Sequence, residues 1–557
     1  MQQNQEQQPV IFLKEGSERT EGREAQNGNI AAAKAVAQAI RTTLGPEGMD
    51  KMLVDAMGDV VITNDGSTIL REMEIEHPAA RMMVEIATTQ DEMVGDGTTT
   101  AVVIAGELLR QAEELLEQDI HPTVIAHGYR KAAQKAGEIL GDIAINVHRD
   151  DAFILRRVAE TAMTGKGAEA AREKLATLVV DAVSMVADDD GYLDQDYLKI
   201  EQKVGGSIEE SELVEGIVID KERLHPGMPA RVEDARILLL NAPIEFSKGE
   251  VDTEITITSP DEVQQYLDEE ERMVRVSVEK ILASGANVVF CQKGIDETAE
   301  MFLSRAGVIA LRRVKRSDME RLSRATGASV VNRLESVLPS DLGYAATVEE
   351  RKTAGQQMIY VTGCDNPKVA TLLVRGGTKQ VVDEVSRAID DALQVVGLSM
   401  EDGQVLPGGG APEMELSLRL REFATGESGR VQLAIESFSK ALEIVPRSIA
   451  ENSGLDPIDA VINLRIAHEQ SRLRHGINVE GNAPVDMLDA GVLEPIRVKS
   501  QAISSAVEAA IMVIRVDDII SAAPKGPGDL SPEEMGGMAP GMGGMPGGMG
   551  GLPPGLM

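Results

Sequence analysis

A glycine-flanked acid at the start of a helical pattern constrains the fold of this chain more than any other feature. The segment VGDGTTTAVVI (residues 94–104) places Asp96 between two glycines and runs through three threonines into apolar residues. The first-turn amides of a helix lack intrahelical partners and carry partial positive charge, and a carboxylate offers oxygens to a hard cation such as Mg²⁺. The motif therefore predicts a helix whose first turn binds the phosphates and metal ion of a nucleotide triphosphate. Asp and Thr are also ordinary helix caps, so the motif alone leaves a purely structural turn open.

Three further segments offer compatible chemistry. TLGPEGMDK (43–51) follows an alanine-rich helical run, and its glycines could expose amides to an anion. DVVIT (59–63) is typical of a short strand that pairs with MLVD (52–55) and is followed by Asn64, Asp65 and Gly66. LPGGGAPE (406–413) is a second glycine cluster that opens a helix. Each segment alone also fits a helix cap, a turn or a loop.

Together, these segments resemble the ATP-binding domain of chaperonins, specifically the group II family of archaeal thermosomes and the eukaryotic cytosolic chaperonin. The resemblance extends from about residue 28 to about residue 523. The motifs that carry it are LGPEGMD (44–50), ITNDG (62–66), GDGTTT (95–100), TGKG (164–167), IDDAL (389–393), GGGA (408–411) and GVLEP (491–495). A chance match to all of these motifs is not credible.

The resemblance implies a multidomain α and α/β protein with the chaperonin fold. Because nucleotide-binding segments lie in both outer parts of the chain, residues 28–149 and 405–523 are expected to form one mainly helical equatorial ATPase domain. Residues 150–216 and 367–404 would form a small intermediate α/β domain, and 217–366 an α/β apical domain with a helical lid protrusion near 246–282. Residues 1–27 are predicted to be flexible, and the Gly/Met-rich residues 524–557 to be a disordered tail.

Local patterns predict several helices within this division. Apolar residues at three- and four-residue spacing predict helices over 78–93, 98–117 and 122–145. In the apical segment, Ser317 and Glu320 have the spacing of a capping box, which predicts the start of a helix that ends at Gly327.

The resemblance also assigns the functional residues. Asp96 would bind the metal ion, and Asp65 and Asp391 would flank the attacking water as catalytic residues. The nucleotide-binding positions are Leu44, Gly45, Pro46, Gly97, Thr98, Thr99, Thr100, Lys166, Gly409, Gly410 and Asp489. Phosphoryl transfer needs an aligned water, charge neutralisation and a proton acceptor, which two carboxylates and a metal ion supply. Asp390 and Asp391 are adjacent acids on an amphipathic helix, and only the family pattern favours Asp391.

One position departs from the family pattern. The family usually has Lys in the loop where this chain has Glu47, so a cation near the phosphates is lost. Binding through backbone amides does not use that side chain and is expected to persist. The predicted cofactors are ATP and Mg²⁺, with K⁺ as a further candidate, and Glu47 is expected to weaken nucleotide affinity or increase its dependence on these cations.

Composition excludes several classes of partner. The formal net charge of −36 opposes binding to nucleic acid or to an anionic membrane. No run of about 18 apolar residues is present to span a bilayer. Two cysteines without a CxxC pair, and the lack of a secretory pattern, favour a reducing cytoplasm. The acid excess is typical of a halophile's cytosolic protein and predicts that stability depends on salt.

These inferences predict an ATP-dependent chaperone that encloses non-native proteins in a double-ring cavity. Its rings would contain the chain itself or paralogous subunits, and a built-in lid would replace a separate cochaperonin. Ring size and the choice between homo- and hetero-oligomer stay open. A small-molecule kinase or ATPase is a rival, although the Walker pattern GxxxxGK[ST] and GxGxxG are both missing. A non-hydrolysing ring scaffold is a second rival, for which Asp65→Ala and Asp391→Ala would leave function intact.

Overall fold

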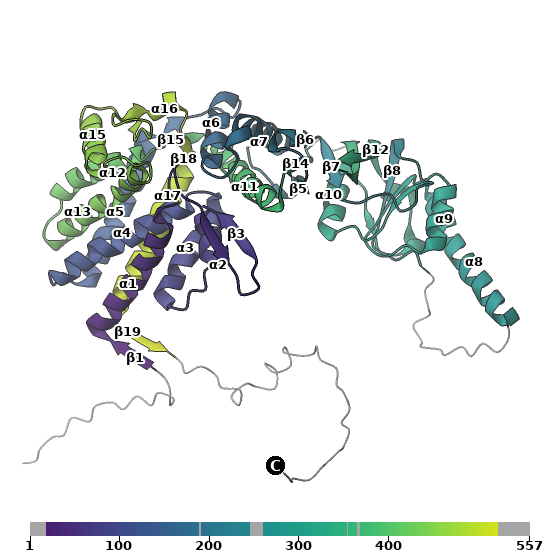
Figure 1. Cartoon of the computed structure of the whole chain (residues 1–557), viewed down its shortest axis with the longest axis horizontal. Helices are drawn as coiled ribbons and strands as arrows, with labels where there is room; N and C mark the ends of the chain where they lie inside the picture. Colours follow the sequence, from purple (N-terminus) through teal and green to yellow (C-terminus); the bar gives the residue numbers. More distant parts are fainter. Residues whose placement is uncertain (1–17, 189–190, 246–259, 354, 365–367, 522–557) are drawn as a thin grey trace, which may run out of the picture. The chain divides into compact units, whose positions relative to one another are not determined.

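The computed structural model describes residues 18–188, 191–245, 260–353, 355–364 and 368–521 (Figure 1). The chain separates into two compact units, residues 1–28 with 516–557, and residues 29–515. In the first unit, β1 (Glu18–Glu21) pairs antiparallel with β19 (Asp518–Ser521). The Arg19 guanidinium contacts the Asp518 carboxylate at 2.7 Å across this pair. The predicted Gly/Met tail and the 246–259 part of the predicted lid lie outside the described residues.

Helices from both outer parts of the chain share one hydrophobic core. Its buried residues come from 30–140 and from 406–514. The helices are α1 (Gly22–Arg41), α2 (Gly66–Glu72), α3 (Pro78–Val94), α4 (Thr98–Glu117), α5 (Pro122–Ile143), α12 (Ala411–Thr425), α13 (Arg430–Leu442), α14 (Ile444–Asn452), α15 (Pro457–Glu469), α16 (Met487–Ala490) and α17 (Ile496–Arg515). The segment that follows Asp96 and the segment around Gly409 therefore pack into the same core.

Small side chains let these helices approach closely, as a chain with 2% aromatic residues requires. A Cβ on Gly106 of α4 would lie 2.3 Å from Ala37 Cβ, and one on Gly128 of α5 would lie 2.4 Å from Ala434 Cβ. Only glycine fits at these two crossings, because real carbon atoms do not approach so closely.

Short strands join the two outer parts. β15 (Gln404–Pro407) pairs antiparallel with both β4 (Ile145–Asn146) and β18 (Leu493–Pro495). β2 (Lys51–Val54) and β3 (Val60–Thr63) form the predicted hairpin, with Lys51 opposite Thr63. β16 (His475–Gly476) pairs with β17 (Val485–Asp486).

A second core contains elements of the inserted segment. Its buried residues come mainly from 147–198 and 370–405. The helices are α6 (Ala152–Met163), α7 (Arg172–Val186) and α11 (Lys379–Asp402), with the short 3-10 helices η1 (Glu169–Ala171), η2 (Gln195–Tyr197) and η3 (Ile208–Glu210) nearby. β14 (Ala370–Gly376) pairs parallel with β5 (Leu198–Val204) and antiparallel with β6 (Glu212–Val214).

The rest of the inserted segment is an α/β unit around one mixed sheet. The strands lie in the order β10 (Ile309–Leu311), β9 (Val288–Cys291), β8 (Arg231–Leu240), β12 (Gly343–Thr353), β13 (Gln356–Cys364) and β7 (Gly216–Ile219), and β11 (Val330–Val331) pairs with β8. The helices are α8 (Pro260–Ser284), α9 (Glu297–Arg305) and α10 (Arg316–Thr326), with η4 (Leu334–Ser336) and η5 (Pro339–Asp341). Apolar side chains form two large clusters here, and Val218, Met358 and Tyr360 belong to a third, smaller one.

The predicted capping box in this unit is wrong, although Gly327 ends α10 as expected. Helix α10 begins at Arg316, and Lys315 is the N-cap without a side-chain bond. Ser317 therefore lies inside the first turn, where it cannot be the N-cap, and Glu320 accepts a hydrogen bond from Arg316 at 2.9 Å. The predicted domain boundaries stay a prediction. Among the described residues, no helix has the length and apolar character needed to cross a bilayer.

Candidate functional site

Asp96 lies in a turn that only glycines on both sides permit. Helix α3 ends at Gly95 with φ of 72°, and α4 begins after Gly97 with φ of 78°. The Asp96 carboxylate accepts a hydrogen bond from the Gly97 amide at 2.8 Å. Helical bonding in α4 starts with the Ala101 amide, which donates to the Gly97 carbonyl. The amides of residues 98–100 thus precede the helical ladder and suit an anion.

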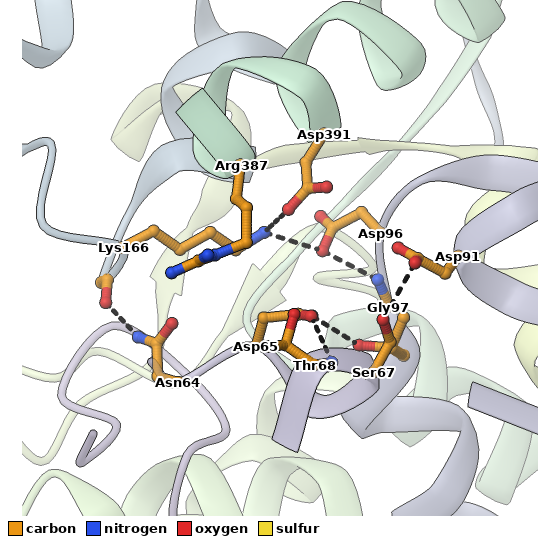
Figure 2. Close-up of polar contacts among 12 residues, drawn as sticks. Asn64, Asp65, Ser67, Thr68, Asp91, Asp96, Gly97, Lys166, Arg387 and Asp391 are labelled. Carbon is orange, nitrogen blue, oxygen red and sulfur yellow. Dashed lines mark hydrogen bonds and ion pairs between the residues drawn. The ribbon is translucent and has the colours of Figure 1, made fainter. Parts of the chain in front are cut away.

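Asp65 caps helix α2 beside this turn (Figure 2). Its carboxylate accepts the Thr68 amide at 2.7 Å and the Thr98 hydroxyl at 3.2 Å. Burial raises the cost of ionisation, but Lys166 and the Thr68 amide outweigh it, so the pKa of Asp65 is lowered. Asp65 is therefore an ionised carboxylate that faces the first turn of α4.

Lys166 joins the inserted segment to the Asp96 turn. Its Nζ atom lies 2.6 Å from Asp391 Oδ2 and 3.4 Å from Asp96 Oδ1 (Figure 2). The Lys166 and Asp391 side chains are 14% and 13% exposed. Burial opposes the positive charge, but Asp391, Asp96 and Asp65 together raise the pKa of Lys166. The ammonium group therefore stays charged among three carboxylates.

The structure separates Asp391 from its neighbour Asp390. Both lie on α11, but Asp390 is exposed whereas Asp391 is directed at Lys166. Burial raises the pKa of Asp391 well above its usual range, against the attraction of Lys166. Asp391 is thus more basic than Asp65, whose pKa is lowered.

The Leu44–Pro46 loop lies next to the same group of residues. Asn452 donates its amide to the Leu44 carbonyl at 2.8 Å. A Cβ on Gly165 would lie 3.5 Å from the Gly45 carbonyl oxygen, so the turn that carries Lys166 lies against this loop. Asn64 also contacts the turn that carries Lys166, because its side-chain amide donates a hydrogen bond to the Gly165 carbonyl.

Helix α14 connects this loop to the second glycine cluster. A Cβ on Gly410 would lie 2.7 Å from Pro446 Cβ, and one on Gly45 would lie 3.4 Å from Ile449 Cγ1. Both contacts are made by α14, which fixes the spacing of the two loops. Gly410 has φ of 77° and is the N-cap of α12, so this cluster also presents a helix start.

Asp489 lies in α16, on the side of the Gly409 loop. The Gly409 carbonyl accepts the Ile477 amide at 2.8 Å, and a Cβ on Gly409 would lie 2.8 Å from Met487 Sδ. Asp489 follows Met487 by two residues and has an exposed side chain. Asp489 thus lies near the second glycine cluster because it is two residues from Met487, which contacts Gly409.

Sequence reasoning missed two polar residues that support the site. Asn64 lies within the ITNDG motif (62–66), but the family pattern gave it no role. Gln90 is fully buried and donates to the Asp96 carbonyl at 2.8 Å. The helical pattern of the sequence could have indicated that Gln90 is buried, because Met83, Ala87 and Val94 lie on the same apolar face of α3.

The donor set around Asp96 fits Mg²⁺ bound together with a nucleotide. Among the described residues, no group of three His, Cys, Asp or Glu side chains could by itself hold a metal ion. Mg²⁺ usually keeps several waters and binds through one or two carboxylates plus substrate phosphates. The single carboxylate of Asp96, beside first-turn amides suited to phosphate, has this chemistry.

Comparison with known proteins identifies the class of protein. Residues 36–524 match the TCP-1/cpn60 chaperonin family, and the chain belongs to this family. It is similar to thermosome subunit beta of Archaeoglobus fulgidus, with 58% identity over 518 residues that cover 92% of this chain and 95% of the relative. Thermosome subunit alpha of the same organism is 54% identical over 517 residues, again covering 92% and 95%.

A solved structure agrees with these matches. The open-state monomer of a group II chaperonin from Methanococcoides burtonii aligns with a TM-score of 0.59 and 48% identity, covering 76% of this chain and 100% of that one. The predicted resemblance to group II chaperonins and the predicted chaperonin fold are therefore confirmed. The protein is a chaperonin, and the matches give no support to the small-molecule kinase.

Proposed function

We propose that this chaperonin hydrolyses Mg-ATP at the Asp65–Asp96–Lys166–Asp391 cluster and couples hydrolysis to closure around a non-native protein. The observation that carries the proposal is the ion contact of Lys166 with both Asp391 and Asp96. Lys166 and Asp391 belong to the inserted segment, whereas Asp65 and Asp96 belong to the first outer part of the chain. The cluster is complete only when both parts contribute.

The nucleotide would bind between the two outer parts. Its phosphates would accept hydrogen bonds from the amides of Gly97 to Thr100 and from the Leu44–Pro46 loop. Gly409 and Gly410 would approach it from the other side, and Asp489 would contact the ribose. Asp96 would hold Mg²⁺, which when bound neutralises phosphate charge. K⁺ is a further candidate ion.

Hydrolysis would use two carboxylates of different basicity. The lowered pKa of Asp65 keeps it ionised, so it can orient water as a hydrogen-bond acceptor. The raised pKa of Asp391 suits a group that accepts the proton of the attacking water. Incoming phosphate charge would compete with Asp391 for Lys166 and free the Asp391 carboxylate for this role.

Client enclosure extends the proposal beyond this site. The relatives are named alpha and beta subunits, which supports assembly of this chain with itself or with paralogues in stacked rings. Non-native proteins would be the clients, and the segment near 246–282 would form the lid without a separate cochaperonin. Glu47 would leave amide binding intact and either weaken nucleotide affinity or increase its dependence on K⁺ and Mg²⁺.

The test compares two adjacent acids. Asp391→Ala is expected to lower the rate of ATP hydrolysis by about 100-fold or more while nucleotide still binds. Asp390→Ala is the matched control, because its side chain is exposed on the same helix, and it should retain activity. Refolding of a denatured client and electron microscopy in high salt, with and without ATP, should show rings that close only in the active proteins. Unchanged hydrolysis and refolding with Asp391→Ala would favour a non-hydrolysing scaffold, and monomers would contradict assembly.

A further inference from the structure

The buried side-chain amide of Gln90 forms hydrogen bonds with the Asp96 turn and with helix α17. Gln90 Nε2 donates to the Asp96 carbonyl at 2.8 Å and to the Val498 carbonyl at 3.1 Å. Gln90 is 0% exposed, and its Oε1 atom has no hydrogen-bond partner among the described residues. Because both acceptors are carbonyl oxygens, only the NH₂ group can occupy this end of the side chain.

The turn also packs directly on this amide. A Cβ on Gly97 would lie 3.1 Å from Gln90 Nε2 and 2.8 Å from Val498 Cγ1. Val498 lies in the first turn of α17, which belongs to the C-terminal part of the chain. Gln90 therefore joins the Asp96–Gly97 peptide to a helix from the other side of the proposed nucleotide site.

This anchor bears on the direction of the Asp96 carboxylate. The Asp96 carbonyl is held by Gln90, and the next amide, that of Gly97, donates to Asp96 Oδ1 at 2.8 Å. One peptide group is thus fixed at its oxygen by Gln90 and at its nitrogen by the carboxylate. Rotation of that peptide would carry the carboxylate with it.

We propose that Gln90 is a positioning residue that orients Asp96 toward the Mg²⁺ of the bound nucleotide. The proposal rests on the proposed function of this site. Gln90 itself contacts neither metal nor nucleotide. Without its NH₂ group, two buried carbonyls lose a donor, and the Asp96 turn relaxes to restore hydrogen bonding. Loss of such an outer partner typically weakens metal binding by about 10- to 100-fold.

The experiment uses the full-length assembled protein with Gln90→Glu and Gln90→Met. Gln90→Glu keeps the volume and shape, but a neutral buried carboxyl has one O–H donor and cannot serve both carbonyls, and Gln90→Met keeps the length without polar groups. Gln111→Met is the matched control, because Gln111 is 1% exposed on α4 and donates to Glu107 rather than to the Asp96 turn. Binding of ADP is titrated by calorimetry over a range of Mg²⁺ concentrations, and thermal midpoints are recorded in parallel.

Both Gln90 variants are expected to need about 10- to 100-fold more Mg²⁺ for half-maximal ADP binding, whereas Gln111→Met keeps the parent's requirement. In an Asp96→Asn background, Gln90→Met should cause no further change in the Mg²⁺ requirement, because the effect acts through Asp96. Gln90→Asn keeps the amide but shortens its reach by one methylene, so it gives a milder variant with the same direction of effect.

Two outcomes would overturn the proposal. If the Gln90 variants lose thermal stability as Gln111→Met does but keep the parent's Mg²⁺ requirement, Gln90 has a structural role only. If Gln90→Met still raises the Mg²⁺ requirement after Asp96→Asn, its effect does not act through Asp96. A parent protein that binds ADP without any Mg²⁺ dependence would instead contradict the proposed function of the site.

Discussion

Replacing Lys166 by methionine removes the ammonium group that lies among Asp65, Asp96 and Asp391. The contact with Asp391 is 2.6 Å, and both side chains are less than one sixth exposed, at 14% and 13%. Removing one partner of a buried ion pair typically costs about 3 to 5 kcal/mol, because it leaves an uncompensated buried charge. Asp391 can avoid part of this cost by binding a proton, so we expect a loss near the lower end, about 3 kcal/mol at neutral pH.

The loss should grow with pH. In the variant, Asp391 keeps the effect of burial but loses the attraction of Lys166, so its folded-state pKa rises further above the unfolded value. A group with a raised folded-state pKa contributes stability that is fully present below its unfolded pKa and is lost as pH rises through the folded pKa. Lys166→Met should therefore be mild in acid and most destabilising above the raised pKa of Asp391.

A double-mutant cycle tests this reasoning. Denaturant unfolding of the parent, Lys166→Met, Asp391→Asn and the double variant is compared at an acidic and a neutral pH, at fixed salt and protein concentration. Asp391→Asn should restore most of the stability lost in Lys166→Met, with a coupling of about 2 kcal/mol at neutral pH. Additive effects, or a loss that does not change with pH, would refute it.

Two further predictions concern stability. Lys499→Met should destabilise the protein by about 3 to 5 kcal/mol in denaturant unfolding. The reason is that Lys499 lies 2.9 Å from Glu413 and 2.8 Å from Glu494, and all three side chains are largely buried. Rescue by Glu413→Gln would support this cause, and a parent-like midpoint would contradict it. The net charge of −36 should make the thermal midpoint rise from low to molar KCl, because ions screen self-repulsion, whereas a midpoint independent of KCl would argue against that account.

Helix limits that depend on local chemistry could be predicted from the sequence. The predicted helix over 98–117 matches α4, and the one over 78–93 ends one residue before α3 does. Pro78 at a first turn and glycines that adopt positive φ act within a few residues, so the sequence carries their effect. The capping box at Ser317 failed because α10 already begins at Arg316, so Ser317 lies inside the first turn and not at the N-cap.

The site was less predictable where long-range packing selects one residue from a pair. Asp390 and Asp391 have the same chemistry and adjacent positions, and they differ in exposure and in the approach of Lys166, neither of which is visible in the sequence. The family pattern favoured Asp391 from the sequence, and its catalytic role stays a prediction. For Gln90, the position on an apolar helical face was visible in the sequence, but its hydrogen-bond acceptors were not. These acceptors are the carbonyls of Asp96 and Val498, which are far apart from each other in the chain.

The first turn of α17 explains how two distant segments form one site. Val498 accepts a hydrogen bond from Gln90, which also holds the Asp96 turn, and the next residue, Lys499, contacts Glu413 at the start of α12. The two sides of the proposed nucleotide site are therefore joined by buried contacts, and Val498 itself packs in the second core together with residues of the inserted segment. Lys166, by contrast, reaches Asp96 only through an ion contact at 3.4 Å. Because a charged ligand competes for an ion contact far more readily than for buried packing, we expect a bound nucleotide to displace Lys166 from Asp96 before it separates Val498 from Gln90.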